Sequence, residues 1–206
     1  MSSISLRRSI RWLPDPPSEP THTVVLIGPS GVFLDVRFLK ASPKQIDWAF
    51  AGYRTEVSPN VVEFKHHIDS RTTEPVVDTG TNSTISPGVT LEVGEMVNPE
   101  TGKMTAYEEI WEEPRLESVS AMFIRNVAGT VWHARVNQWQ IALGRDAEGR
   151  FWAWQAVKRA GSEWDVIYAT GDKSRVHLLS KETENWKKGE KQAWDGDMWV
   201  VLDAEG

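Results

Sequence analysis

The sequence predicts an all-β protein built from two tandem antiparallel β-barrel-like lobes that are related by an internal repeat. The prediction depends on many short apolar runs, few segments of helical periodicity, and a repeat that spans most of the chain. Short strands about 8–12 residues apart, separated by Gly, Pro and Ser turns, are typical of barrels and sandwiches. Closure into barrels also removes exposed strand edges, so we favour barrels, with one continuous sandwich as the alternative.

A glycine and a tryptophan that recur at one spacing mark the repeat. An offset of 116 residues links Gly28 to Gly144 and Trp48 to Trp164. Between the two markers each copy reads as strand, Gly-containing turn, strand, polar turn and strand. Such a duplicated meander indicates how apolar strand faces are buried, and it carries little information on chemistry.

The first lobe is expected over residues 21–115, after an N-terminal extension at residues 1–20 that is rich in Ser, Arg and Pro and is compatible with an edge strand around residues 9–13. Alternating apolar residues predict half-buried strands at residues 24–27, 32–39, 46–51 and 61–68. The Thr, Ser, Asp and Pro composition of residues 69–87 predicts a long loop, and a hairpin of residues 89–97 with 103–112 follows.

The strand at residues 32–39 has two unlike faces. One face is apolar throughout and consists of Val32, Leu34, Val36 and Phe38. The other face is mixed and consists of Phe33, Asp35, Arg37 and Leu39. Because successive strand residues point to opposite sides, the mixed face predicts a polar or ligand-facing side of this strand.

The second lobe is expected over residues 119–206, after a boundary at Pro114 and the charged residues 112–117. Asp195-Gly196 is a strong signal for a tight turn. A short helical turn is expected within residues 181–188. The strands are expected at residues 120–126, 131–143, 150–159, 164–169 and 175–180, with a closing hairpin of residues 192–194 and 198–202.

The composition is rich in tryptophan, with 11 Trp against 3 Tyr in 206 residues. One buried Trp removes on the order of 200 Å² of surface from water and carries one N–H that needs a partner. The tryptophans are therefore expected to line cores, pockets or an interface, because so many on the surface would make the protein insoluble.

Charge and cysteine usage exclude several classes of function. The formal net charge of −6 and the lack of a long basic run argue against nucleic-acid binding. With no cysteine there is no disulfide framework, no thiolate nucleophile and no Cys-based zinc site. No secretory or membrane-spanning segment is apparent, so we expect a cytoplasmic protein with no membrane span and no cofactor.

Three strings of the sequence resemble a known family. They are Trp48-Ala49-Phe50-Ala51-Gly52, Glu109-Ile110-Trp111 with the nearby Pro114, and Ile141-Ala142-Leu143-Gly144-Arg145. In their order along the chain they resemble the Hri-one family of fungal proteins, over roughly residues 23–202. The resemblance implies a lipocalin-like (calycin-like) tandem β-barrel and a fungal, intracellular setting. It implies no particular activity.

No motif for a metal, a nucleotide or a serine nucleophile is present. His66 and His67 are adjacent, and neighbouring strand residues point to opposite faces, so they are expected to be a partly exposed pair rather than metal ligands. The spacings of zinc proteases, phosphate-binding loops and nucleophile elbows do not occur. We therefore expect no metal site.

The segment from Trp132 to Arg135 holds the first candidate site. Strand period places His133 and Arg135 on one face, about 7 Å apart, and Trp132 and Ala134 on the other. If the polar face looks into a Trp-walled cavity, it can bind a carboxylate, phenolate or enolate. If it looks outward, it holds a solvated His and an Arg paired to a Glu.

Two further strand faces combine charge with tryptophan. Arg150, Trp152 and Trp154 share a face and can form an aromatic slot with a cation–π contact, although filling of the core is the simpler reading for at least one of the tryptophans. Glu109 and Trp111 also share a face, which brings a carboxylate beside a Trp. A buried Glu109 is a candidate acid or base, and an exposed Glu109 is an ordinary surface carboxylate.

These patterns predict the binding of an apolar or aromatic small molecule in a Trp-lined barrel. The ligand-binding candidates are Trp111, Trp132, Arg150, Trp152 and Trp154. The first alternative is a cofactor-independent isomerase, cyclase or pericyclase of fungal secondary metabolism, in which His133 or Arg135 stabilises developing enolate charge and Glu109 transfers a proton. The second alternative is a protein-interaction scaffold that binds no small ligand.

Overall fold

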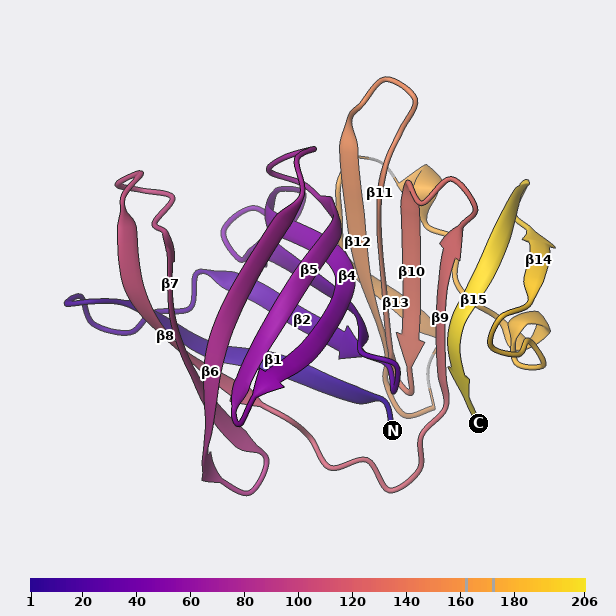
Figure 1. Ribbon diagram of the computed structural model, residues 1–206. Coiled ribbons are helices and arrows are strands. Elements are labelled where there is room, and N and C mark those ends of the chain that lie inside the picture. The colour runs from indigo at the N-terminus through magenta and orange to yellow at the C-terminus, as the bar shows by residue number, and fades with distance from the viewer. Residues whose placement is uncertain (162, 172) are drawn as a thin grey trace.

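The computed structural model describes residues 1–161, 163–171 and 173–206, and it confirms the all-β prediction. Figure 1 shows a barrel formed by the N-terminal half of the chain beside a sheet formed by the C-terminal half. In the described residues, helix is limited to two 3-10 turns, Lys173–Arg175 and Lys181–Thr183. The second turn lies where a short helical turn is predicted.

The barrel is closed and antiparallel, and its strands follow one another in chain order. They are β1 (Ser3–Trp12), β2 (Thr21–Ile27), β3 (Val32–Leu39), β4 (Ile46–Ser58), β5 (Val61–Asp69), β6 (Val76–Ser86), β7 (Val89–Val97) and β8 (Met104–Glu112). Closure comes from β1, which pairs with β2 on one side and with β8 on the other.

Two parts of the first lobe differ from the sequence-based expectation. The extension at residues 1–20 contains β1, which begins at Ser3, well before the edge strand expected around residues 9–13, and closes the barrel. Its inward side chains Ser5 and Arg7 are polar because they face a polar interior. The expected loop at residues 69–87 contains β6, which pairs with β5 and β7. Most of β6 is polar because one face meets solvent and the other meets the barrel interior, so the apolar alternation of a strand is absent.

The C-terminal half forms a seven-stranded antiparallel sheet in the order β13-β12-β11-β10-β9-β15-β14. The strands are β9 (Ala121–Asn126), β10 (Val131–Val136), β11 (Trp139–Arg145), β12 (Phe151–Lys158), β13 (Trp164–Ala169), β14 (Lys191–Trp194) and β15 (Asp197–Glu205). The order leaves β13 and β14 at the ends of the sheet, whereas the N-terminal barrel closes on itself.

Two expected strands of the second lobe take another form. The strand expected at residues 131–143 is a hairpin of β10 and β11, which turns at Asn137 with a φ of 48°. Asn tolerates this left-handed conformation better than other non-glycine residues. Residues 176–180 form no strand, and the main chain of Leu179 is instead hydrogen-bonded by the side chain of Gln140.

The repeat is present in strand order but not in residue register. Three consecutive neighbours, β2 to β4, correspond to β11 to β13. Trp48 pairs with Arg37, while Trp164 pairs with Lys158, five residues beyond the position that an offset of 116 requires. The two copies therefore share the strand order of a meander but not its pairing register.

The largest apolar core lies between the two lobes. It joins the outward face of β2, β3 and β4 to one face of the C-terminal sheet. Phe38 from the barrel is fully buried and stacks on Tyr168, with ring centroids 5.4 Å apart. A polar contact crosses the same interface, where the side chain of Gln155 donates to the carbonyl oxygen of Val36 at 2.7 Å. The barrel is thus buried on its outside, and its interior need not serve as the main core.

We predict that Phe38→Ala lowers the free energy of unfolding by about 3–5 kcal/mol, because it opens a cavity in the core that both lobes share. Val77→Ala, on the exposed outer surface of β6, should change it by less than about 0.5 kcal/mol. Urea unfolding of the two variants measures the difference. Equal stability of Phe38→Ala and the parent would show that this interface does not hold the fold.

Candidate functional site: the barrel cavity

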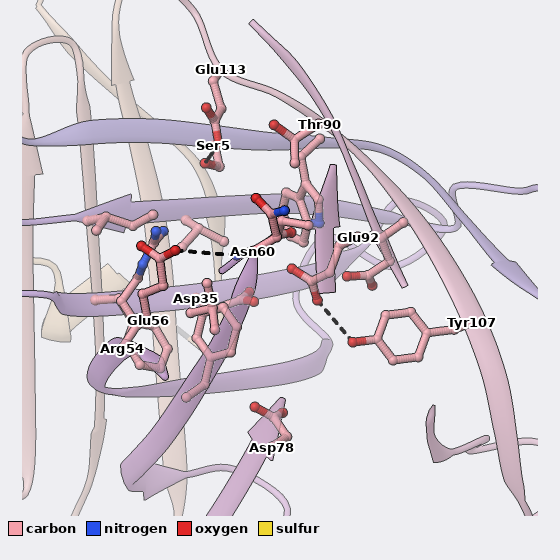
Figure 2. A pocket seen from close by; sticks show the side chains of 18 of the residues that line it. Ser5, Asp35, Arg54, Glu56, Asn60, Asp78, Thr90, Glu92, Tyr107 and Glu113 are labelled. Atoms are coloured by element: carbon pink, nitrogen blue, oxygen red, sulfur yellow. Dashed lines mark hydrogen bonds between the residues drawn. The ribbon is translucent and has the colours of Figure 1, made fainter. Parts of the chain in front are cut away.

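The interior of the barrel contains a cavity of about 300 Å³ (Figure 2). Phe33, Asp35 and Arg37 of β3 line it, so the mixed face of this strand, for which the sequence predicts a polar or ligand-facing side, faces the cavity. The opposite face of β3, which is apolar, packs in the core between the lobes. Strand alternation thus assigns the two faces of β3 to two different environments.

One wall of the cavity is apolar and largely aromatic. Trp48 and Phe50 come from β4, with ring centroids 4.3 Å apart, and Phe33 meets Phe50 edge-on at 5.7 Å. The cluster that forms this wall consists of Val25, Ile27, Phe33, Trp48, Phe50 and Trp111, with Phe64 and Met96 packed against it. These side chains offer flat surfaces to an aromatic or branched apolar body.

A network of buried charges lies beside the aromatic wall. Arg37 pairs with Asp35 at 2.7 Å and with Glu109 at 3.3 Å. Glu109 also accepts a short hydrogen bond from Arg7, which pairs with Glu19 at 2.9 Å. Burial by itself lowers the pKa of Arg37, but the negative charges of Asp35 and Glu109 outweigh it and raise the pKa, so the guanidinium stays charged.

Glu92 and Tyr107, from the neighbouring strands β7 and β8, point toward one another in the lining of the cavity (Figure 2). The Tyr107 hydroxyl donates to the carboxyl of Glu92 at 2.9 Å. Burial, and then the negative charge of Glu109, raises the pKa of Glu92 to about 8. Gly80 of β6 leaves room for this side chain, because a Cβ at that position would lie 2.7 Å from Glu92 Oε1. The cavity therefore contains a carboxyl group that is largely protonated at neutral pH.

His66 lies behind the aromatic wall. Its ring stacks on Phe50 at 4.1 Å, and its Nδ1 is 2.7 Å from Asp69. Burial lowers the pKa of His66, but Asp69 and Asp78 outweigh it and raise the pKa above its ordinary value. His67 points to the other face of β5 and contacts Tyr53 and Trp132, as expected for neighbouring strand residues.

Two polar atoms of the cavity lining are buried and have no hydrogen-bond partner among the described residues. They are the indole nitrogen of Trp111 and one carboxylate oxygen of Asp78. Buried polar groups in folded proteins nearly always have partners. Both side chains line the cavity, and the described residues leave the hydrogen-bonding capacity of these two atoms unused, as a donor and an acceptor respectively.

The structure separates the residues that the sequence analysis suggested for a site. Glu109 and Trp111 both line the barrel cavity, whereas His133, Trp152 and Trp154 line a second cavity in the C-terminal lobe. Glu109 therefore cannot share a reaction with His133. The sequence pattern resolved faces within a strand, but it did not show which strands surround one cavity.

Three candidates lie outside both cavities. Trp132 is buried in the core between the lobes and donates to the carbonyl oxygen of Gly129. The guanidinium of Arg135 lies 3.6 Å from Glu184, but the solvated His133 of the outward-facing alternative is wrong, because His133 is buried. The exposed side chain of Arg150 pairs with Asp146 and Glu148, so the cation that lies over Trp152 is Arg175, at 5.9 Å.

Sequence reasoning missed Arg7, Glu92 and Tyr107 as site residues. Arg7 lies in the expected N-terminal extension at residues 1–20, before the edge strand expected around residues 9–13, so the sequence does not place it in the barrel. Glu92 and Tyr107 lie in the predicted hairpin, where Glu92 faces Glu109 directly across the β7–β8 pair. Tyr107, Glu109 and Trp111 are two residues apart along β8, so strand alternation places all three side chains on one face. This spacing was the signal that could have identified Tyr107.

Neither a metal centre nor a membrane helix is found in the part of the chain that the structure describes. No group of three or more His, Asp or Glu side chains there is arranged to hold a metal ion. None of the helices described has the length and hydrophobicity that a membrane span requires.

Comparison with known proteins identifies a family and a related fold. The family model described as Protein HRI1 matches residues 3–203. The crystal structure of an uncharacterized protein from Saccharomyces cerevisiae superposes with a TM-score of 0.80 and 15% sequence identity, covering 100% of both chains. At this identity the likeness establishes the fold alone. A search of curated proteins finds no match.

The raised pKa of Glu92 predicts that stability falls as the pH rises. The folded state holds this proton up to about pH 8, whereas an ordinary Glu releases it near pH 4.5, so folding is progressively penalised between these values. Glu92→Gln removes the penalty and should be more stable than the parent at pH 9, by on the order of a few kcal/mol, and nearly equal at pH 5. Urea unfolding across this pH range measures the difference.

The matched control is Glu95→Gln, which removes a solvent-exposed carboxyl from the same strand. If the stability difference between Glu92→Gln and the parent is the same at pH 5 and pH 9, then Glu92 is not a protonated group of the cavity.

Proposed function

This chain belongs to the HRI1 family, and from that premise we propose that it binds a small apolar or aromatic molecule in the cavity of its N-terminal barrel. The observation that carries the proposal is the cavity of about 300 Å³ with an aromatic wall and two unpaired polar atoms. Its volume lies at the lower end of the range of about 300–1,000 Å³ for small-molecule sites.

The lining supports a ligand with two unlike ends. The apolar body packs against the rings of Phe33, Phe50 and Trp111. A hydrogen-bond acceptor on the ligand meets the indole N–H of Trp111, and a donor meets the free oxygen of Asp78. A long, fully saturated chain would leave both polar atoms unpaired, so a compact molecule with a few polar groups fits better.

Catalysis without a cofactor is the second candidate, and Glu92 favours it. A protonated carboxyl next to Tyr107 in the barrel cavity is a proton donor of the kind that isomerases and cyclases use. Glu109 is paired with both Arg7 and Arg37, which suits a fixed negative charge better than a group that exchanges protons. The substrate would be a flexible, largely apolar and cyclisable molecule such as a fungal secondary metabolite.

Ligand binding can be tested by intrinsic tryptophan fluorescence, because Trp48 and Trp111 both line the cavity. We predict that at least one member of a panel of aromatic polyketides, terpenoids and fatty acids quenches or shifts the emission in a saturable manner. Val25→Phe, which fills the cavity from β2, should weaken that binding at least about tenfold. Val77→Phe makes the same change on the exposed outer surface and should leave the affinity unchanged.

Equal affinity of the Val25→Phe variant and the parent would place the ligand elsewhere. The absence of binding across the panel would favour the scaffold alternative, for which the exposed apolar side chains of Val77, Val93 and Met104 offer a surface. If the parent converts a bound compound and the Glu92→Gln variant does not, catalysis is favoured over simple binding.

A further inference from the structure

The C-terminal lobe contains a second cavity, of about 240 Å³, on the face of its sheet that points away from the barrel. Strand alternation places Trp132 and Ala134 of β10 in the core between the lobes and turns His133 to the opposite side. The segment from Arg175 to Trp199, together with β12, lines the cavity over this face. The two cavities are therefore separated by the sheet and by the core between the lobes.

Tryptophans surround His133 in this second cavity. The His133 ring meets Trp154 edge-on at 4.8 Å and lies 5.9 Å from Trp194. Trp194 in turn meets Trp199 at 5.5 Å. His133 is 2% exposed, and its Nε2 atom is buried with no hydrogen-bond partner among the described residues. The cavity thus has aromatic walls and one unpaired polar atom.

The protonation of His133 follows from its neighbour Gln140. The Gln140 side chain accepts from the N–H of Leu179 at 2.8 Å and donates to the carbonyl oxygen of the same residue at 3.2 Å, which fixes the orientation of its amide. The Gln140 amide also interacts with the His133 ring, and Nε2 is the ring nitrogen that has no partner among the described residues. With the ring proton on the nitrogen next to Gln140, Nε2 is a bare acceptor.

Burial keeps His133 neutral. Desolvation dominates over the hydrogen bond to Gln140 and lowers the pKa of His133 to about 3. Nε2 therefore remains an acceptor throughout the physiological pH range.

The aromatic walls are held in place by their own contacts. Trp152 lies across Gly144, where an added Cβ would be 2.7 Å from the ring, so this repeat glycine makes room for one wall. The indole N–H of Trp154 donates to the carbonyl oxygen of Arg175, and that of Trp199 donates to the carbonyl oxygen of Trp194. Walls fixed in this way lose little conformational freedom when a ligand binds.

We propose that the C-terminal cavity is a second binding site, which takes a planar aromatic molecule that donates an N–H or O–H hydrogen bond to His133 Nε2. The size of the cavity limits the ligand to one or two rings. This site is independent of the barrel cavity, because no residue lines both.

Indole and 1-methylindole form a matched pair of probes, since they share a shape and only indole has an N–H. Titration of the full chain, followed through the indole N–H signals in ¹H–¹⁵N spectra, should shift the signals of Trp152, Trp154, Trp194 and Trp199. Indole should bind about three- to tenfold more tightly than 1-methylindole, the difference expected for one hydrogen bond. Single Trp→Phe variants assign the signals.

His133→Phe keeps an aromatic ring and removes the acceptor, so it should abolish the preference for indole. The matched control is His67→Phe, which makes the same change on the outer face of β5 and should keep the preference. The proposal is overturned if indole shifts only the signals of Trp48 and Trp111, if no Trp signal shifts, or if the parent binds both probes equally. The comparison of the two probes on the parent protein does not depend on the folding of any variant.

Discussion

The burial of the outer face of β2, β3 and β4 against the C-terminal sheet is the constraint on which the rest of the structure depends. Apolar burial stabilises at roughly 25 cal/mol per Å² wherever it occurs, so a fold that supplies it between two lobes does not need it inside each of them. Fully buried side chains such as Leu34 and Phe123 meet in this layer. The interior of the barrel and the far side of the second sheet are thereby free to hold cavities.

The buried charges of the barrel reinforce this division. Removing Arg7, Arg37 and Glu109 from water costs several kcal/mol each, and only their mutual pairing offsets that cost. The network therefore keeps part of the barrel interior polar, beside the aromatic cluster, where Arg37 lies over the Trp48 ring at 5.0 Å.

The two lobes share a meander of strands but offer different chemistry. The barrel cavity combines aromatic rings with a dense set of carboxyl and guanidinium groups, whereas the cavity of the second lobe centres on one neutral histidine among tryptophans. A shared fold does not carry a shared function, since the chemistry depends on the side chains that line each site. The repeat glycine Gly144 illustrates the point, because it makes room for Trp152, while its counterpart Gly28 lies against Asp203.

The sequence by itself determined the all-β class, most strands and the faces of individual strands. Alternation correctly separated Phe33, Asp35 and Arg37 from the apolar face of β3, and His133 from Trp132. It failed for the first half of β1 and for β6, because both faces of β6 and the inner face of β1 meet polar surroundings, so neither shows the apolar alternation of a strand. Only the tertiary structure decided that Arg7 meets Glu109, that Arg150 lies on the surface, and that Glu109 and His133 belong to different cavities. The physical reason is that alternation reports which residues share a face, while the surface that covers that face comes from strands far away in the chain.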